Sequence, residues 1–160
     1  MIGWYLGHSE GSYNGVIGPE YGIFINAGPT AVYDYLADFT KHGEWSEGLN
    51  IEAVSEGPTE VGSEFKSVGK QFGKDVANDI KVIEAQRPLR LAFVASADGT
   101  DFLQEIDLSE SGGGTRLQRR LSFDANPLLK IIFGLVIGPF FAGPTMNKAL
   151  RNFKAKLEES

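Results

Sequence analysis

The chain has 160 residues, enough for one domain with a substantial hydrophobic core. Fifteen lysine and arginine residues stand against 21 aspartate and glutamate residues, and the net charge of −6 argues against a protein that binds nucleic acid. The sequence contains no cysteine, which excludes disulfides, thiolate zinc sites, iron–sulfur clusters and cysteine nucleophiles.

The N-terminal residues 1–20 differ from the rest of the chain. Glycine recurs there every three to four residues, with neither helical nor strand periodicity. We expect a flexible segment there, followed by a single domain over residues 21–160. Met1–Gly18 lacks the basic start and apolar run of a secretory signal, and the longest apolar run, Ile131–Ala142, is too short to span a membrane. The expected location is the cytoplasm.

Three short elements begin the predicted domain. Tyr21–Asn26 is expected to form a strand. Pro29–Phe39 follows as a helix, because proline suits the first helical turn and apolar residues then recur at helical spacing. Lys41–Trp45 is predicted to be a very short helix or turn.

From residue 49 onward, apolar and polar residues alternate, which predicts strands separated by turn residues. The predicted strands are Leu49–Ser55, Ser63–Lys70, Asp75–Glu84, Arg90–Ala97, Asp101–Ser109 and Thr115–Asp124. Short connections between successive strands predict an antiparallel meander. Together with the first strand this makes an α+β fold with seven strands.

The C-terminal part of the chain has two patterns. Leu128–Gly143 is almost entirely apolar and is interrupted by Gly-Pro pairs. From Thr145 an amphipathic pattern begins, which predicts a long C-terminal helix that covers the apolar face of the sheet. Its apolar stripe consists of Met146, Leu150, Phe153 and Leu157.

The order of these elements resembles the START-like, or SRPBCC, superfamily, which includes polyketide cyclase/dehydrase-like proteins. The segments that carry the resemblance are INAGPTAVYDYLADFTKHGEW, VGSEF, VIEAQRPLRLAF and ALRNFKAKLEE. The resemblance covers residues 21–160 and implies the helix-grip fold, in which a seven-stranded curved antiparallel sheet wraps around a long C-terminal helix. It also implies a deep apolar cavity between the sheet and that helix.

Alternation places one polar residue on the apolar face of each of three strands: Arg119, Gln104 and Asn78. In such a cavity they would contact a ligand. Alternatively, Arg119 lies at the sheet edge or pairs with a carboxylate, and the two amides satisfy hydrogen bonds of the core. The aromatic candidates for ligand contact are Trp45, Phe93, Phe102, Phe133 and Phe140. A tryptophan in this position more often packs as a core or mouth aromatic than contacts a ligand.

No catalytic motif is recognisable. Two histidines without cysteine offer little for a metal site, and we expect neither a metal nor a cofactor. Neither histidine belongs to a recognisable Ser–His–Asp arrangement. His42 lies in a polar segment, where a solvated side chain is expected rather than one that transfers protons.

These observations predict a protein that binds a hydrophobic or aromatic small molecule, lipid- or polyketide-like, in its cavity. One alternative is a polyketide cyclase or dehydratase in which Arg119, Gln104 and Asn78 orient substrate oxygens. The other is a lipid-transfer protein that makes transient contact with membranes through Leu128–Ala142. That segment is either a kinked part of the core or a gate at the cavity mouth.

Overall fold

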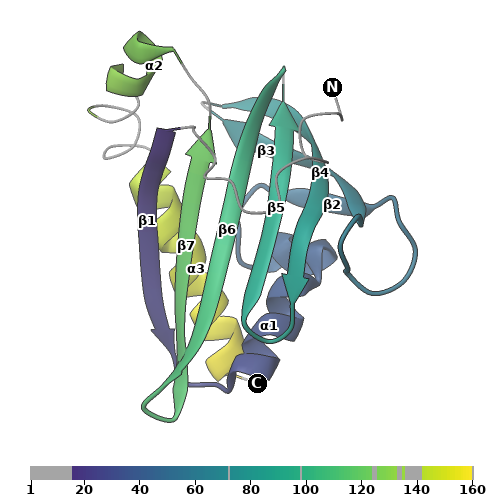
Figure 1. Ribbon diagram of the computed structural model, residues 1–160, viewed down its shortest axis with the longest axis vertical. Coiled ribbons are helices and arrows are strands. Elements are labelled where there is room, and N and C mark those ends of the chain that lie inside the picture. Colours follow the sequence, from purple (N-terminus) through teal and green to yellow (C-terminus); the bar gives the residue numbers. More distant parts are fainter. Residues whose placement is uncertain are drawn as a thin grey trace.

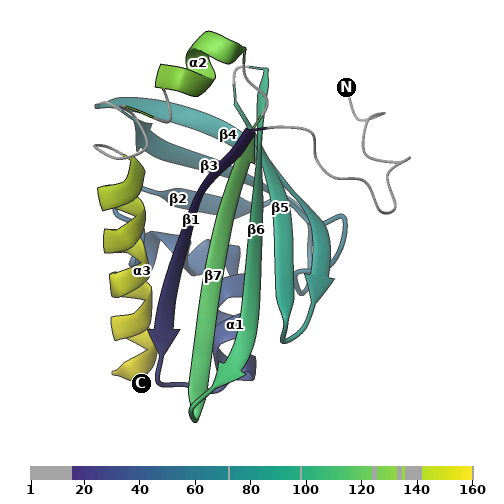
Figure 2. The same cartoon turned by 60° about the vertical axis from the view of Figure 1, so that its left-hand side comes forward.

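A seven-stranded antiparallel sheet, in the order β1-β7-β6-β5-β4-β3-β2, curves around the long helix α3 (Figures 1 and 2). The computed structural model describes residues 16–71, 73–97, 99–123, 126–132, 135 and 142–159. The strands are β1 (Val16–Ile25), β2 (Asn50–Ala53), β3 (Glu64–Gln71), β4 (Lys74–Gln86), β5 (Arg90–Ala97), β6 (Thr100–Ser111) and β7 (Gly114–Phe123). The helices are α1 (Pro29–Ala37), the 3-10 helix η2 (Phe39–Glu44), α2 (Pro127–Ile132) and α3 (Gly143–Glu158).

The topology is the helix-grip fold that the sequence predicts. From β2 to β7, each strand pairs with the next along the chain, as in a meander. β1 pairs instead with β7, so that β1 and β2 form the two edges of the sheet. The chain crosses between these edges through α1 and η2, and α1 and α3 lie on the same concave face (Figure 2).

The predicted strand boundaries agree with the structure to within a few residues, except for β1. This strand begins at Val16 rather than at Tyr21, because β7 continues far enough to pair with the earlier residues. The register shifts between Ile17 and Glu20, where Gly18 and Pro19 lie. Proline cannot donate to a strand ladder, and it is tolerated at such an irregularity. Residues 1–15 lie outside the described part of the chain.

The hydrophobic core lies between the concave face of the sheet and the helices. Leu150 and Phe153 of α3 are buried, and Met146 and Leu157 of the same predicted stripe are partly buried. Full burial of a side chain of this size stabilises the fold by about 1.5–3 kcal/mol. Within the described part of the chain, no helix is both long and apolar enough to cross a membrane.

The convex face of the sheet carries a network of ion pairs centred on Arg90. Its guanidinium lies 2.7 Å from Glu84, 2.6 Å from Glu105 and 2.6 Å from Asp107. Arg120 of β7 joins the same network, 3.7 Å from Glu105. These arginines therefore have carboxylate partners on the solvent side of the sheet.

Gly114 provides a test of the packing at the start of β7. A Cβ at this buried position would lie 2.6 Å from Cζ of Phe24 and still closer to the carbonyl oxygen of Ile25. We expect Gly114→Ala to lower the free energy of unfolding by about 1–3 kcal/mol, because backbone and ring must shift. Urea denaturation followed by circular dichroism measures this change.

The control is Gly22→Ala in the neighbouring strand. There a Cβ would meet its nearest atom, the Leu117 carbonyl oxygen, at 3.6 Å, which is ordinary contact. This variant should be neutral or slightly stabilising, since alanine restricts the unfolded chain. Equal stabilities of the two variants would contradict the packing described here.

Candidate functional site

Arg119 is the polar centre of the concave face. Its position on β7 is directly opposite Tyr21 of β1 on one side and Ile106 of β6 on the other. Its Nε donates a hydrogen bond to Oε1 of Gln104 over 3.0 Å. The guanidinium lies deep among protein atoms, although the residue keeps partial solvent accessibility. Burial lowers the pKa of Arg119 to about 10, with Tyr21 acting in the opposite direction, so the group stays charged at neutral pH.

This buried cation has no counter-ion in the described part of the chain. Gln104 is neutral, and no ion pair to a described aspartate or glutamate includes Arg119. Arg120, the next residue, points to the convex face and lies near Glu105 and Glu20. A charge removed from water without a partner is costly, which makes Arg119 an unusual feature of the interior.

Two further buried donors lack partners among the described residues, and one of them, on Tyr21, is next to Arg119. The Tyr21 hydroxyl and the Trp45 indole N–H are buried and form no hydrogen bond within the described structure. Tyr21 is the register partner of Arg119, and burial raises the pKa of its phenol, against the influence of Arg119. An unsatisfied buried donor costs about 1–3 kcal/mol. These donors therefore indicate a place where an acceptor is missing.

His42 connects Trp45 to this centre. Its ring centroid lies 4.7 Å from that of Phe39 and 4.6 Å from that of Trp45. Burial lowers the pKa of His42 to about 4, opposed by its hydrogen bond to the Leu36 carbonyl and helped by the charge of Arg119. The ring is therefore neutral at pH 7, and its Nε2 donates to the Leu36 oxygen over 2.7 Å.

The expectation of a solvated His42 is wrong. The polar segment that carries it forms η2, whose Phe39 and His42 are buried over the concave face. The polarity of the segment did not indicate the burial of His42, because that burial depends on which other elements pack against the segment. Tyr21 was also missed, although it alternates with Ile23 and Ile25 on one face of β1.

The other predicted site residues fall into three groups. Phe93 and Phe102 lie on the concave face, where Phe93 meets Phe39 edge-on at 4.9 Å and Phe102 lies 5.8 Å from Phe123. Asn78 is on β4, three strands from the strand of Arg119 and two strands from that of Gln104. Phe133 and Phe140 lie outside the described residues.

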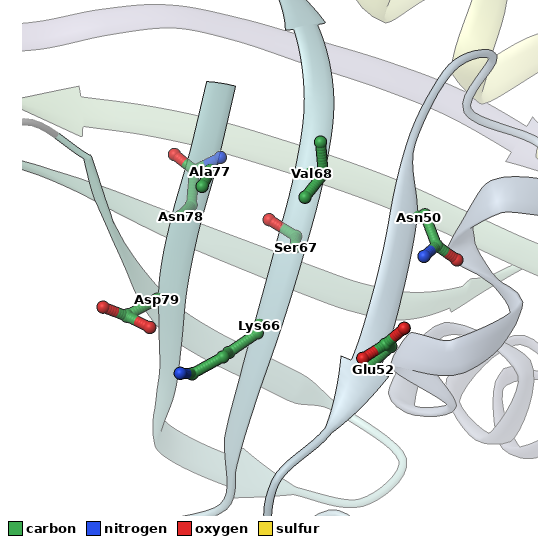
Figure 3. Close-up of a pocket in the computed structure, with 8 residues that line it drawn as sticks. All are labelled: Asn50, Glu52, Lys66, Ser67, Val68, Ala77, Asn78 and Asp79. Carbon is green, nitrogen blue, oxygen red and sulfur yellow. The ribbon is translucent and has the colours of Figure 1, made fainter. Parts of the chain in front are cut away.

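A hollow of about 440 Å³ lies along β2, β3 and β4 (Figure 3). Most of its lining residues are exposed on the convex side, with Lys66 directly opposite both Glu52 and Asp79. Figure 3 shows the Lys66 side chain extending toward the strand of Asp79. This hollow is open and polar, and its charged lining residues, Glu52, Asp79 and Lys66, are exposed to solvent. The Arg119 centre, whose charge is buried, is therefore the stronger candidate site.

No cluster of three potential metal ligands (His, Asp or Glu) occurs in the ranges that the structure describes. The chemistry at the Arg119 centre is that of hydrogen-bond donors around one positive charge. Such a site recognises an acceptor group on a ligand whose remainder fits an apolar interior.

Comparison with known proteins identifies relatives of this fold. Residues 20–158 match the family described as polyketide cyclase/dehydrase and lipid transport. No curated protein sequence matches the chain.

Solved structures resemble it at low sequence identity. A START superfamily protein from Mycobacterium smegmatis has a TM-score of 0.70 at 12% identity, over 90% of this chain and 99% of that one. A protein from Rhodobacter sphaeroides has a TM-score of 0.69 at 23% identity, over 90% and 98% of the two chains. A protein from Thermus thermophilus has a TM-score of 0.68 at 19% identity, over 88% and 98%.

The buried His42 makes stability depend on pH. Its folded-state pKa of about 4 lies below the ordinary value of 6.5, so the unfolded chain takes up the proton first as pH falls. The contribution of neutral His42 to the free energy of unfolding is fully present above about pH 6.5 and is lost as the pH falls toward 4. Between pH 7 and pH 5, His42 alone should cost about 2 kcal/mol of unfolding free energy.

His42→Gln keeps an N–H donor for the Leu36 carbonyl but cannot take up a proton. Urea denaturation at pH 7 and pH 5 should therefore show a smaller loss for the variant than for the original chain. Identical losses would mean that His42 does not remain neutral in the folded protein.

Proposed function

Because the chain belongs to the polyketide cyclase/dehydrase and lipid transport family, we propose that it binds a hydrophobic or aromatic small molecule between the concave face of its sheet and α3. One observation carries the proposal: the buried guanidinium of Arg119 has no counter-ion among the described residues, and the neighbouring Tyr21 hydroxyl is a buried donor without a partner there. Folded proteins pair the great majority of their buried polar groups. A ligand with acceptor oxygens supplies the missing partners.

The accessibility of the concave face supports this place for the ligand. Several side chains there keep partial solvent accessibility, although they belong to the side that the helices cover. They are Ile23, Ala95, Phe102, Gln104, Arg119 and Leu121. Partial accessibility at the centre of a packed layer is expected where side chains line an internal space rather than interlock.

Binding is favoured over a cyclase or dehydratase reaction. The oxygen-orienting trio expected from the sequence is spread over β4, β6 and β7, with Asn78 three strands from Arg119. His42 is neutral and its Nε2 donates to the Leu36 carbonyl, so that nitrogen has no proton-accepting lone pair at neutral pH. The polar groups that remain can hold a ligand.

A neutral apolar fluorophore, N-phenyl-1-naphthylamine, tests the proposal. It should bind saturably at about one molecule per chain and be displaced by fatty acids or flat aromatic compounds. Native mass spectrometry of the purified protein should also show a co-purifying small molecule. A fluorescence titration without saturation would overturn the proposal.

Two matched variants locate the probe. Ala95→Phe fills a partly accessible position on the concave side of β5 and should abolish binding. Ala77→Phe makes the same change in the convex hollow and should leave binding intact. Both folds are checked by circular dichroism. Loss of binding only with Ala77→Phe would place the probe in the convex hollow instead.

A second candidate function, transfer of the ligand to and from a bilayer, is favoured by α2. This helix begins a few residues after β7 ends, at one end of the sheet (Figure 1). Apolar residues in and just after it are exposed, with accessible fractions of 66% for Leu128, 58% for Ile131 and 69% for Leu135. Neighbouring exposed side chains of this kind are typical of a surface that contacts a membrane or a partner.

Co-sedimentation with phosphatidylcholine vesicles tests the membrane contact. These vesicles carry no net charge, which suits a chain of net charge −6. The double variant Leu128→Ser, Ile131→Ser should bind them several-fold more weakly than the original chain. Leu89→Ser is the control, because Leu89 is 56% exposed in the turn between β4 and β5, at the other end of the sheet (Figure 1). Equal binding by all three proteins would refute contact through α2.

A further inference from the structure

The charge balance of the concave face leaves one positive charge uncompensated. The described groups around Arg119 are uncharged: Gln104 is an amide, Ile106 is apolar, and Tyr21 and His42 are neutral at pH 7. Arg90 and Arg120, by contrast, have carboxylates within 4 Å on the convex face. A cation held in the interior attracts a single negative charge far more strongly than it would in water.

The hydrogen-bond donors of Arg119 and Tyr21 also favour an anionic group. A guanidinium has five N–H donors, and the described structure pairs one of them, on Nε, with Gln104. That bond occupies the Gln104 oxygen and orients the guanidinium. Tyr21, directly opposite on β1, has a buried hydroxyl without a partner. The group that fits the remaining guanidinium donors and the neighbouring hydroxyl is one that only accepts hydrogen bonds.

The single positive charge of Arg119 favours a ligand with a single negative charge over one with two. An ionised carboxylate has one negative charge and two acceptor oxygens, which match one guanidinium and one hydroxyl. A phosphate monoester has a charge of about −1.5 to −2 at pH 7, and would leave excess negative charge in the interior.

We propose that the bound molecule is a hydrophobic carboxylic acid whose carboxylate accepts hydrogen bonds from Arg119 and from the Tyr21 hydroxyl. The statement rests on the function proposed above and specifies its ligand class. Gln104 positions the guanidinium, and the apolar part of the acid lies among the side chains of the concave face. No covalent step is involved.

Competition against N-phenyl-1-naphthylamine tests the proposal with three probes of equal chain length. Dodecanoate should displace the fluorophore at a concentration at least tenfold below that of dodecanol, because only the acid neutralises Arg119. Dodecyl phosphate should bind more weakly than dodecanoate. Equal affinities for dodecanoate and dodecanol, or a preference for the phosphate, would overturn the proposal.

Substitutions at Arg119 and Tyr21 test whether these residues cause the preference for dodecanoate over dodecanol. Arg119→Met should weaken dodecanoate by about ten- to a hundredfold and leave dodecanol nearly unchanged, the range expected for a charge-assisted hydrogen bond. Arg119→Lys should restore part of the preference. Tyr21→Phe, which removes only the hydroxyl, should weaken dodecanoate several-fold. Equal loss of the acid and the alcohol in Arg119→Met would assign Arg119 to structure instead.

The matched control is Arg120→Met. It makes the same change one residue along β7, on the convex face beside Glu20 and Glu105, and should leave all affinities unchanged. Should Arg119→Met fail to fold, Tyr21→Phe and the comparison of acid with alcohol still decide the question. Absence of any binding by the neutral fluorophore would refute the proposed function itself, whereas binding without acid preference refutes only the carboxylate.

Discussion

The packing of Phe153 is the interaction on which the rest of this structure depends. Its side chain is fully buried, with its ring 5.3 Å from that of Tyr35 in α1 and 5.2 Å from that of Trp45 just after η2. One residue of α3 thus joins all three helical segments of the concave side. Without it, Trp45 and Tyr35 would each lose an aromatic contact, and α3 would lose its ring contacts with the other helical segments.

The arginines on the two faces of the sheet differ in their surroundings. Three arginines follow one another closely on β7: Arg116 is exposed, Arg120 lies among carboxylates, and Arg119 alone faces the core. On the convex side, water screens the charges and ion pairs contribute modestly to stability. On the concave side, the charge of Arg119 has no carboxylate partner among the described residues, and burial strengthens its action on neighbouring groups.

Such a centre reduces the stability of the empty protein. Unpaired donors and an uncompensated charge oppose folding, and the apolar contacts around them must offset that cost. A ligand that satisfies these groups binds only the folded chain, and therefore adds its binding free energy to stability. In the function proposed here, ligand binding and stability would therefore depend on the same few side chains.

Local pattern was enough to predict much of this molecule. Alternation identified the strands and placed Arg119 and Gln104 on the concave face, because side-chain direction in a strand depends only on position along it. Proline at the first turn marked the start of α1, and four-and-three spacing marked the buried stripe of α3. The order of these elements, together with their local sequences, resembles the START-like superfamily, and that resemblance implied the helix-grip fold.

The composition of the site was decided by tertiary structure. Tyr21 and Arg119 are far apart in sequence and become neighbours only because β1 pairs with β7. Asn78 has the same alternation as Arg119 but lies three strands away, and His42 is buried because η2 packs over the sheet. Whether an inward arginine meets a carboxylate depends on the register between strands and on what covers them, and neither property is local to the residue.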